Sequence, residues 1–180
     1  MAKKRTAIKL DLGAGQNPTP GFLGVDLWEG ADVPLDLLTF PWPWQDRSVD
    51  EIVSNHFVEH IPMNTTGPDL LCQFMNEVWR VLRPGGRATI QHPHLHSDRA
   101  FWDPTHRRFI PYMTWYYFDA EWRKANGLDH YPIVADFTVV TIEGCGIAND
   151  VATKHHEVQQ QLQDRSWNVI ADTKVILERR

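Results

Sequence analysis

Apolar segments separated by polar breaks along the first half of the chain predict a series of short strands. Segments that contain closely spaced apolar residues cover 7–12, 22–27, 50–54 and 87–92, with glycine, proline or polar residues at their ends. Short segments with such boundaries are typical of strands buried in a sheet. We therefore expect the first half of the protein to be built mainly on these strands.

A helical pattern precedes the last of these strands. Apolar residues recur at helical spacing from Leu70 to Leu82, after Pro68 and Asp69, two residue types that favour the start of a helix. The Arg-Pro-Gly-Gly segment at 83–86 then ends the helix. Because a strand, a crossover helix and a second strand form a βαβ unit, we expect a mostly parallel sheet with helices on both faces.

The C-terminal part of the chain predicts two more strands. Residues 136–143 and 167–178 are rich in Val, Ile and Thr, and the segment between them has no clear pattern for a helix of three turns. We expect these strands to form an antiparallel pair at one edge of the sheet. The complete prediction is an α/β, Rossmann-like single domain over residues 1–180.

Composition and charge restrict the classes of function. The chain has 180 residues and a net charge of -5, which fits one domain and argues against nucleic acid as a partner, because nucleic-acid binders usually present a basic face. Cys72 and Cys145 lack CxxC spacing, which favours a reducing compartment. The basic residues 1–5 are not followed by the apolar core of a signal peptide, and no apolar run could span a membrane. We expect a cytoplasmic protein.

A glycine-rich turn indicates a ligand site. Residues 10–15, Leu-Asp-Leu-Gly-Ala-Gly, predict a strand and a turn that lets the backbone approach a ligand closely. Pro18, Pro20 and Gly21 leave no room for the helix that would bind a pyrophosphate. Asp26 also follows sooner than the roughly 20 residues expected for the ribose-binding acid of a dinucleotide site. A nucleoside ligand without phosphates, such as S-adenosylmethionine, fits better than NAD, and a tight turn without a ligand is the alternative.

Several segments, taken in order, resemble class I S-adenosylmethionine-dependent methyltransferases of the broad type 11 kind. The segments are LDLGAG (10–15), FLGVDL (22–27), PLDL (34–37), FPWPWQDRSVDEIVSNHFVEHIP (40–62) and FMNEVWRVLRPGGRATIQHP (74–93). The resemblance implies a seven-stranded, mostly parallel sheet in the minimal form of this fold. It also implies S-adenosylmethionine as the cofactor, bound across the carboxyl ends of the first strands.

The resemblance further assigns roles to individual residues. The methionine part of the cofactor would be held at Asp11, Gly13 and Gly15, the ribose by Asp26, the adenine beside Asp36 and Leu37, and the amino acid end beside Asn55. Two features depart from the family pattern. Asn17 replaces the third glycine of the loop, and the helix that normally follows the loop is absent, so one side of the cofactor would be less enclosed.

Candidate catalytic residues follow the strand at 50–54. His56 and His60 are spaced i, i+4, with Glu59 between them, and we take His56 as a catalytic candidate. A metal bound by this histidine pair is an alternative, but the sequence places no third ligand beside it, so no metal is predicted.

The segment 91–108 combines four histidines with aromatic and charged residues. Similar methyltransferases carry an Asp-Pro-Thr-His stretch followed by Arg here, which implies that Asp103, His106 and Arg107 form the acceptor side of the site. Two alternatives remain open. These residues could form only a turn and an ion pair, or a zinc hydrolase could use the histidines at positions His92, His94, His96 and His106.

The leading hypothesis is a methyltransferase that uses S-adenosylmethionine to methylate a small-molecule acceptor, or one presented by a partner, whose identity the sequence does not give. The alternative is a catalytically inactive, methyltransferase-like module that binds the cofactor and regulates another process. The sequence leaves homo-oligomerisation open. No membrane partner is expected.

Overall fold

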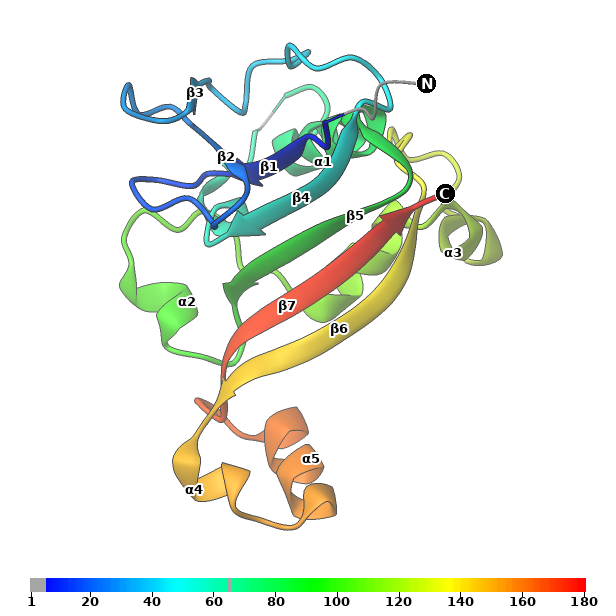
Figure 1. Cartoon of the computed structure of the whole chain (residues 1–180). Helices are drawn as coiled ribbons and strands as arrows, with labels where there is room; N and C mark the ends of the chain where they lie inside the picture. Colours follow the sequence, from blue (N-terminus) through cyan, green and yellow to red (C-terminus); the bar gives the residue numbers. More distant parts are fainter. Residues whose placement is uncertain (1–5, 65) are drawn as a thin grey trace.

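The computed structural model describes residues 6–64 and 66–180, and its centre is a seven-stranded sheet with the order β3-β2-β1-β4-β5-β7-β6 (Figure 1). The basic segment 1–5, which entered the prediction of localisation, lies outside the described residues. The strands are β1 (Lys9–Leu12), β2 (Leu23–Asp26), β3 (Val33–Pro34), β4 (Val49–Asn55), β5 (Leu82–Pro93), β6 (Phe137–Ile147) and β7 (Ile170–Arg179).

The strand directions confirm the predicted fold class. Strands β1 to β5 pair in parallel, whereas β7 pairs in antiparallel fashion with both β5 and β6. The predicted antiparallel pair therefore lies at one edge of the sheet. After β6 the chain turns back, and β7 enters the sheet between β5 and β6. Leu177 of β7 therefore pairs with Ala88 of β5 and with Val139 of β6.

The predicted helix corresponds to α1 (Leu70–Val81). Asp69 caps its N-terminus, since the carboxylate accepts hydrogen bonds from the amides of Leu71 at 2.9 Å and Cys72 at 3.4 Å. The chain leaves the helix at Leu82 in an extended conformation. The remaining helices are η1 (Val58–His60), α2 (Arg99–Trp102), η2 (Tyr112–Phe118), α3 (Ala120–Ala125), α4 (Asn149–Ala152) and α5 (His156–Arg165). Among the described residues, no helix is long and apolar enough to span a bilayer.

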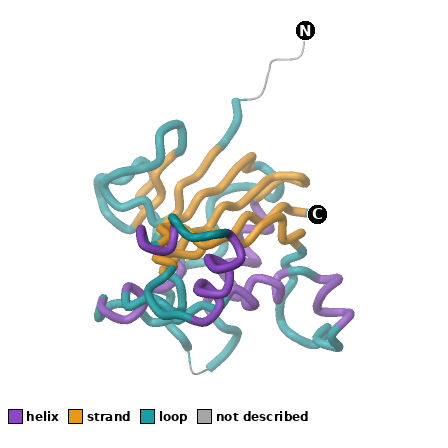
Figure 2. The backbone as a smooth tube through the Cα atoms, turned by 90° about the horizontal axis from the view of Figure 1, so that it is seen from below, coloured by secondary structure: helices purple, strands orange, loops and turns teal. Residues whose placement is uncertain are grey.

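The main hydrophobic core lies on one face of the sheet. Fully buried side chains on this face of the strands, such as Ile52 and Ile90, form one cluster with Phe74 of α1 and Trp115 of η2. Figure 2 shows most helices on the same side of the strands. The cover of the two faces is therefore unequal, whereas the sequence pattern led us to expect helices on both faces.

The opposite face of the sheet carries charged pairs in place of a second helical layer. Lys9 Nζ lies 2.6 Å from a carboxylate oxygen of Glu51, and Arg87 Nε lies 2.8 Å from one of Glu178. These four residues are neighbours in register across β1, β4, β5 and β7, and all are at least one-third exposed. Because no helix follows β1 in the described chain before β2, this face is exposed to water and carries charged side chains of alternating sign.

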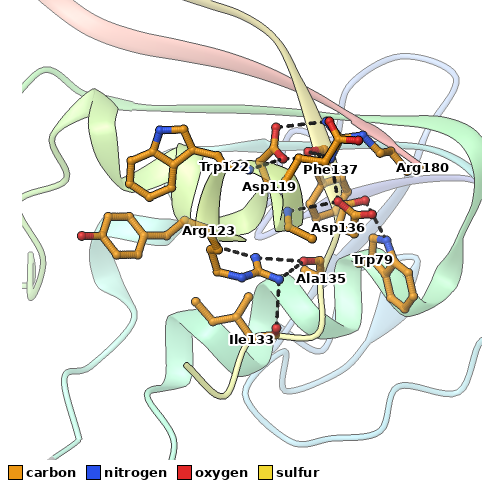
Figure 3. A network of polar contacts seen from close by, with 12 residues as sticks. Trp79, Asp119, Trp122, Arg123, Ile133, Ala135, Asp136, Phe137 and Arg180 are labelled. Carbon is orange, nitrogen blue, oxygen red and sulfur yellow. Dashed lines mark hydrogen bonds and ion pairs between the residues drawn. The ribbon is translucent and has the colours of Figure 1, made fainter. Parts of the chain in front are cut away.

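Two arginines hold the η2–α3 segment against the chain that leads into β6 (Figure 3). Arg123 is buried, and its guanidinium donates hydrogen bonds to the backbone carbonyls of Tyr117, Ile133 and Ala135. Arg180 is more exposed and forms ion pairs with Asp119 at 2.9 Å and Asp136 at 2.6 Å. The first arginine replaces missing backbone hydrogen bonds in an irregular segment, and the second joins that segment to the chain beyond β7.

Candidate active site

A small cavity lies where the chain leaves β2, at the carboxyl edge of the parallel strands. Its volume is about 170 Å³, and it is lined by Asp26, Leu27, Leu35, Asp36, Leu37, Leu38 and Phe57. The structure thus brings together three residues that the resemblance assigned to the adenosine part, namely Asp26, Asp36 and Leu37. The lining contains two carboxylates and no lysine or arginine, which favours hydroxyl groups and disfavours phosphates.

Asp26 is held in a fixed orientation by two backbone amides. Its Oδ2 accepts a hydrogen bond from Gly15 N at 2.9 Å, and its Oδ1 accepts one from Trp28 N at 3.1 Å. A carboxylate has about four lone-pair positions, so both oxygens keep capacity for a further donor. The carboxylate is therefore oriented to accept hydrogen bonds from a pair of hydroxyl groups.

Gly13 and Phe57 are in close contact beside this cavity. Gly13 has a positive φ of 74°, and a Cβ at this position would lie 2.5 Å from Phe57 Cδ2. The Phe57 ring packs in turn against Phe74 of α1, with ring centroids 5.5 Å apart. The glycine is required both for its backbone conformation and for the approach of Phe57, a pocket residue that the sequence analysis did not assign.

The other residues assigned to the cofactor have different local roles. Asp11 is buried, and its Oδ2 accepts a hydrogen bond from Thr19 N at 2.7 Å, which ties down the loop that replaces the usual helix. Asp36 accepts hydrogen bonds from Leu38 N at 2.9 Å and Thr39 Oγ1 at 3.0 Å, and so shapes the turn that carries Leu37. A Cβ atom placed at Gly15 would have no heavy atom within 4 Å among the described residues. Contacts of these residues with the cofactor remain a prediction.

His56 stands directly after Asn55, the exposed last residue of β4, in a left-handed backbone conformation with φ 53°. A non-glycine residue in this conformation is uncommon and is found more often at functional sites. Its Nδ1 lies 3.2 Å from Glu59 Oε1, and its Nε2 lies 3.6 Å from Asp172 Oδ2. The hydrogen bond with Glu59 raises the pKa of His56, burial opposes this rise, and the charge of Asp172 adds to it.

Asp172 is a site residue that the sequence analysis missed. It is buried on β7, and its Oδ2 also accepts a hydrogen bond from Gln91 Nε2 at 3.0 Å. Arg99 Nε lies 3.7 Å from its Oδ1. No local sequence signal could place Asp172 beside His56, because their proximity depends on the register of β7 against β5.

The Asp-Pro-Thr-His segment folds back onto the end of η1. The backbone carbonyl of Glu59 accepts hydrogen bonds from the amides of Arg107 at 2.7 Å and Arg108 at 3.0 Å. As a result the centroids of the His106 and His60 rings lie 4.8 Å apart, and His106 Nε2 lies 3.9 Å from Asp103 Oδ2.

Arg107, the fourth catalytic candidate, has a contact of a different kind. Its side chain is exposed, and its guanidinium is 3.4 Å from the carbonyl of Pro104. The neighbouring Arg108 has the anchoring role, because it donates to the carbonyls of Ile61 and Pro62 and pairs with Asp69 at 2.8 Å. A role of Arg107 toward an acceptor stays a prediction.

The histidines proposed for a zinc hydrolase are not gathered into one site within the described residues. Both ring nitrogens of buried His92 have other partners, since Nδ1 is 2.9 Å from the Pro93 carbonyl and Nε2 is 3.3 Å from Trp115 Nε1. His94 and His96 contact each other instead, with ring centroids 5.6 Å apart. His106 lies instead beside His60 and Glu59, so the four histidines of the zinc-hydrolase alternative do not share one site.

A larger cavity lies beyond the carboxyl end of β5. It has a volume of about 800 Å³, and residues of its lining come from the segment after β5, from η2 and from the two antiparallel strands, including His94, His96, Tyr112, Tyr116, Ile142 and Thr173. This volume falls in the range of small-molecule sites.

The strand order, with β7 antiparallel between β5 and β6, is that of the Rossmann-like fold of class I methyltransferases. Residues 24–90 match the family model for a methyltransferase domain. A search of curated proteins found no match. The family match and the shared fold confirm the resemblance to class I S-adenosylmethionine-dependent methyltransferases.

Solved structures with this fold include three methyltransferases. An S-adenosylmethionine-dependent methyltransferase from Archaeoglobus fulgidus superposes with a TM-score of 0.65 at 19% identity, covering 96% of this chain and 86% of that one. One from Mesorhizobium loti gives 0.54 at 16% identity, covering 96% and 90%. The 1,6-didemethyltoxoflavin N1-methyltransferase from Burkholderia thailandensis, solved with bound 1,6-didemethyltoxoflavin and S-adenosylhomocysteine, gives 0.53 at 18% identity, covering 97% and 72%.

Proposed function

We propose that this protein binds S-adenosylmethionine in the pocket at Asp26 and transfers its methyl group to a small-molecule acceptor. The observation that carries the proposal is the pocket itself, in which a carboxylate fixed by two amides faces apolar walls formed by Leu37 and Phe57. The carboxylate suits the hydroxyl pair of a ribose, and the apolar walls suit an adenine ring. The methyltransferases of known structure that bind such a ligand support the same assignment.

The residues around His56 would act on the acceptor side. When bound, the cofactor supplies a methyl group already activated on a sulfonium, so the protein needs mainly to align the acceptor and exclude water. His56 lies between the carboxylates of Glu59 and Asp172, and its imidazole is placed to hold a proton from an acceptor hydroxyl or amine. The cavity of about 800 Å³ beyond β5 has room for an acceptor of small-molecule size, and its lining includes Thr173, the residue after Asp172, but not His56 itself.

Calorimetric titration with S-adenosylhomocysteine tests the cofactor site. Asp26→Asn should weaken binding about tenfold, about 1.4 kcal/mol, because charge-assisted hydrogen bonds become neutral ones. Asp32→Asn is the matched control, since Asp32 also accepts a backbone amide hydrogen bond next to β2, from Gly24 at 2.8 Å, but does not line the pocket. Failure of the wild-type protein to bind at millimolar ligand would refute the proposal.

A second experiment separates an enzyme from an inactive binding module. The protein would be incubated with S-adenosylmethionine carrying a labelled methyl group and with a broad extract of small metabolites. Labelled products that disappear with Asp26→Asn would support methyl transfer. Tight binding of S-adenosylhomocysteine with no labelled product would favour the regulatory alternative.

A further inference from the structure

Three side chains next to the proposed active site could hold a metal ion. Glu59, His60 and His106 each offer one ligand atom, and these atoms lie within 4.8 Å of one another. In a tetrahedral site with metal–ligand bonds of about 2.0–2.2 Å, ligand atoms are roughly 3.4 Å apart. The ligand atoms that lie farthest apart would have to approach each other by up to about 1.4 Å. His106 is a ligand that the sequence could not place beside His60, and Glu59 takes the place that the sequence analysis considered for His56.

Glu59 supplies an independent sign of a missing ligand. Its side chain is buried, with 2% of the residue exposed, and its Oε2 is a buried atom without a hydrogen-bond partner in the described chain. Its other oxygen, Oε1, is held by His56 Nδ1 at 3.2 Å. A buried carboxylate oxygen without a partner is costly, and a bound cation would remove this cost.

The hydrogen bonds of His106 leave the correct nitrogen free for a metal. Its Nδ1 lies 2.9 Å from the backbone carbonyl of Ala100, which can only accept a hydrogen bond. In the neutral ring Nδ1 must therefore carry the proton, and Nε2 keeps its lone pair. A metal-binding histidine commonly donates its second nitrogen to a carbonyl or a carboxylate in this way.

His60 reaches the same state through Thr105. The Thr105 hydroxyl donates its proton to Asp103 Oδ1 at 2.7 Å, so its oxygen must accept a hydrogen bond from His60 Nδ1 at 3.0 Å. His60 Nε2 then keeps its lone pair as well. The chain from Asp103 through Thr105 to His60 thus orients one ligand, and Asp103 Oδ2 remains at the edge of the group, 3.9 Å from His106 Nε2.

We infer that Glu59, His60 and His106 bind one divalent transition-metal ion of the zinc class. Two imidazoles and one carboxylate suit Zn²⁺, Co²⁺, Mn²⁺ or Fe²⁺ better than Mg²⁺, which prefers oxygen ligands only. This arrangement gives the whole Asp-Pro-Thr-His segment a common purpose, since His106 is a ligand, and Asp103 and Thr105 position His60. It also changes the expectation from the sequence, which predicted no metal.

The proposed function gives such an ion a role, and this step rests on that function. Three protein ligands leave coordination positions open for water or substrate. An acceptor hydroxyl bound there would have a lowered pKa and would release its proton more readily, to His56 or to water. The inference therefore favours an acceptor with an oxygen nucleophile.

Metal binding can be measured without methyl transfer. The full-length protein would be stripped with a chelator and titrated with Zn²⁺ by calorimetry, and with Co²⁺ by visible absorption, which reports the coordination geometry. We expect one equivalent of either ion in the wild type. His60→Asn and His106→Asn should each weaken binding at least about 100-fold, since even outer partners of a metal site contribute 10–100-fold. His155→Asn, which changes an exposed histidine between α4 and α5, should leave it unchanged.

Two further measurements keep the outcome interpretable. Thr105→Val retains all three ligands but removes the hydroxyl that orients His60, so we expect a roughly tenfold loss of metal affinity with a normal circular dichroism spectrum. Calorimetry with S-adenosylhomocysteine on the same samples tests the cofactor site separately, so that either result can fail alone. Less than stoichiometric metal in the wild type, or equal binding in His60→Asn and His106→Asn, would overturn the inference.

Discussion

Gly13 and Gly85 form a matched pair for testing how the glycine loop supports the cofactor pocket. Their φ angles are almost equal, 74° and 73°, but only Gly13 has a neighbour where a Cβ would stand. Alanine at either position adopts a left-handed conformation, which costs roughly 1–2 kcal/mol. At Gly13 the new methyl group would also lie 2.5 Å from Phe57 Cδ2, and Phe57 is backed by Phe74.

The expected stability changes differ because only one substitution displaces a ring. Gly85→Ala should lower the free energy of unfolding by about 1 kcal/mol. Gly13→Ala should lower it by about 3 kcal/mol, because overpacking of a buried contact typically adds 1–3 kcal/mol to the backbone cost. Urea denaturation, followed by circular dichroism, measures both values.

The same pair tests the pocket through ligand binding. Phe57 lines the cavity, so its displacement by Gly13→Ala should weaken S-adenosylhomocysteine binding about tenfold or more, whereas Gly85→Ala should have no effect. The reasoning fails if both variants lose equal stability, or if Gly13→Ala binds the ligand as tightly as the wild type does.

Three other predictions concern stability. Arg123→Met should cost about 3 kcal/mol, because buried carbonyls lose their donor, while Arg180→Met should cost about 1 kcal/mol or less; equal losses in urea denaturation would contradict this. Burial lowers the pKa of His92 below the ordinary 6.5, so the free energy of unfolding should be highest above pH 6.5 and should decline below it. His92→Gln should flatten this decline in unfolding titrations from about pH 7 to about pH 5. Glu51→Gln, in an exposed ion pair, should shift the free energy of unfolding by less than about 1 kcal/mol in the same assay.

The features that the sequence predicted correctly depend on short-range signals. The helix from Leu70 was predicted nearly to its ends, because Asp69 and the Pro-Gly-Gly segment act on neighbouring residues. Asp26 and Asp36 were assigned through the resemblance to methyltransferases, and the structure places both in the lining of one cavity, while their contact with the cofactor stays a prediction. For the helix, signals from neighbouring residues almost determine where it begins and ends.

The features that were missed depend on contacts between distant segments. Asp172 reaches His56 only through the register of β7 on β5, and His106 reaches His60 only because the backbone of Glu59 binds the amides that follow His106. Neither contact leaves a periodic or local trace in the sequence. The unequal cover of the sheet was missed for a related reason, because a helical pattern shows where one helix forms and not which face stays open.

The open face of the sheet should also determine which strand positions tolerate random substitution. Along β5, Ala88 and Ile90 point into the core, while Arg87 and Thr89 point outward, and β7 repeats this alternation around Val175 and Leu177. In a sheet covered by helices on both sides, nearly every strand position would resist polar replacement. In this protein outward positions such as Glu51, Arg87 and Glu178 should accept other solvated residues without loss of the core. Asp11 and Asp172 lie on the same face but are buried beside the proposed site, and should not.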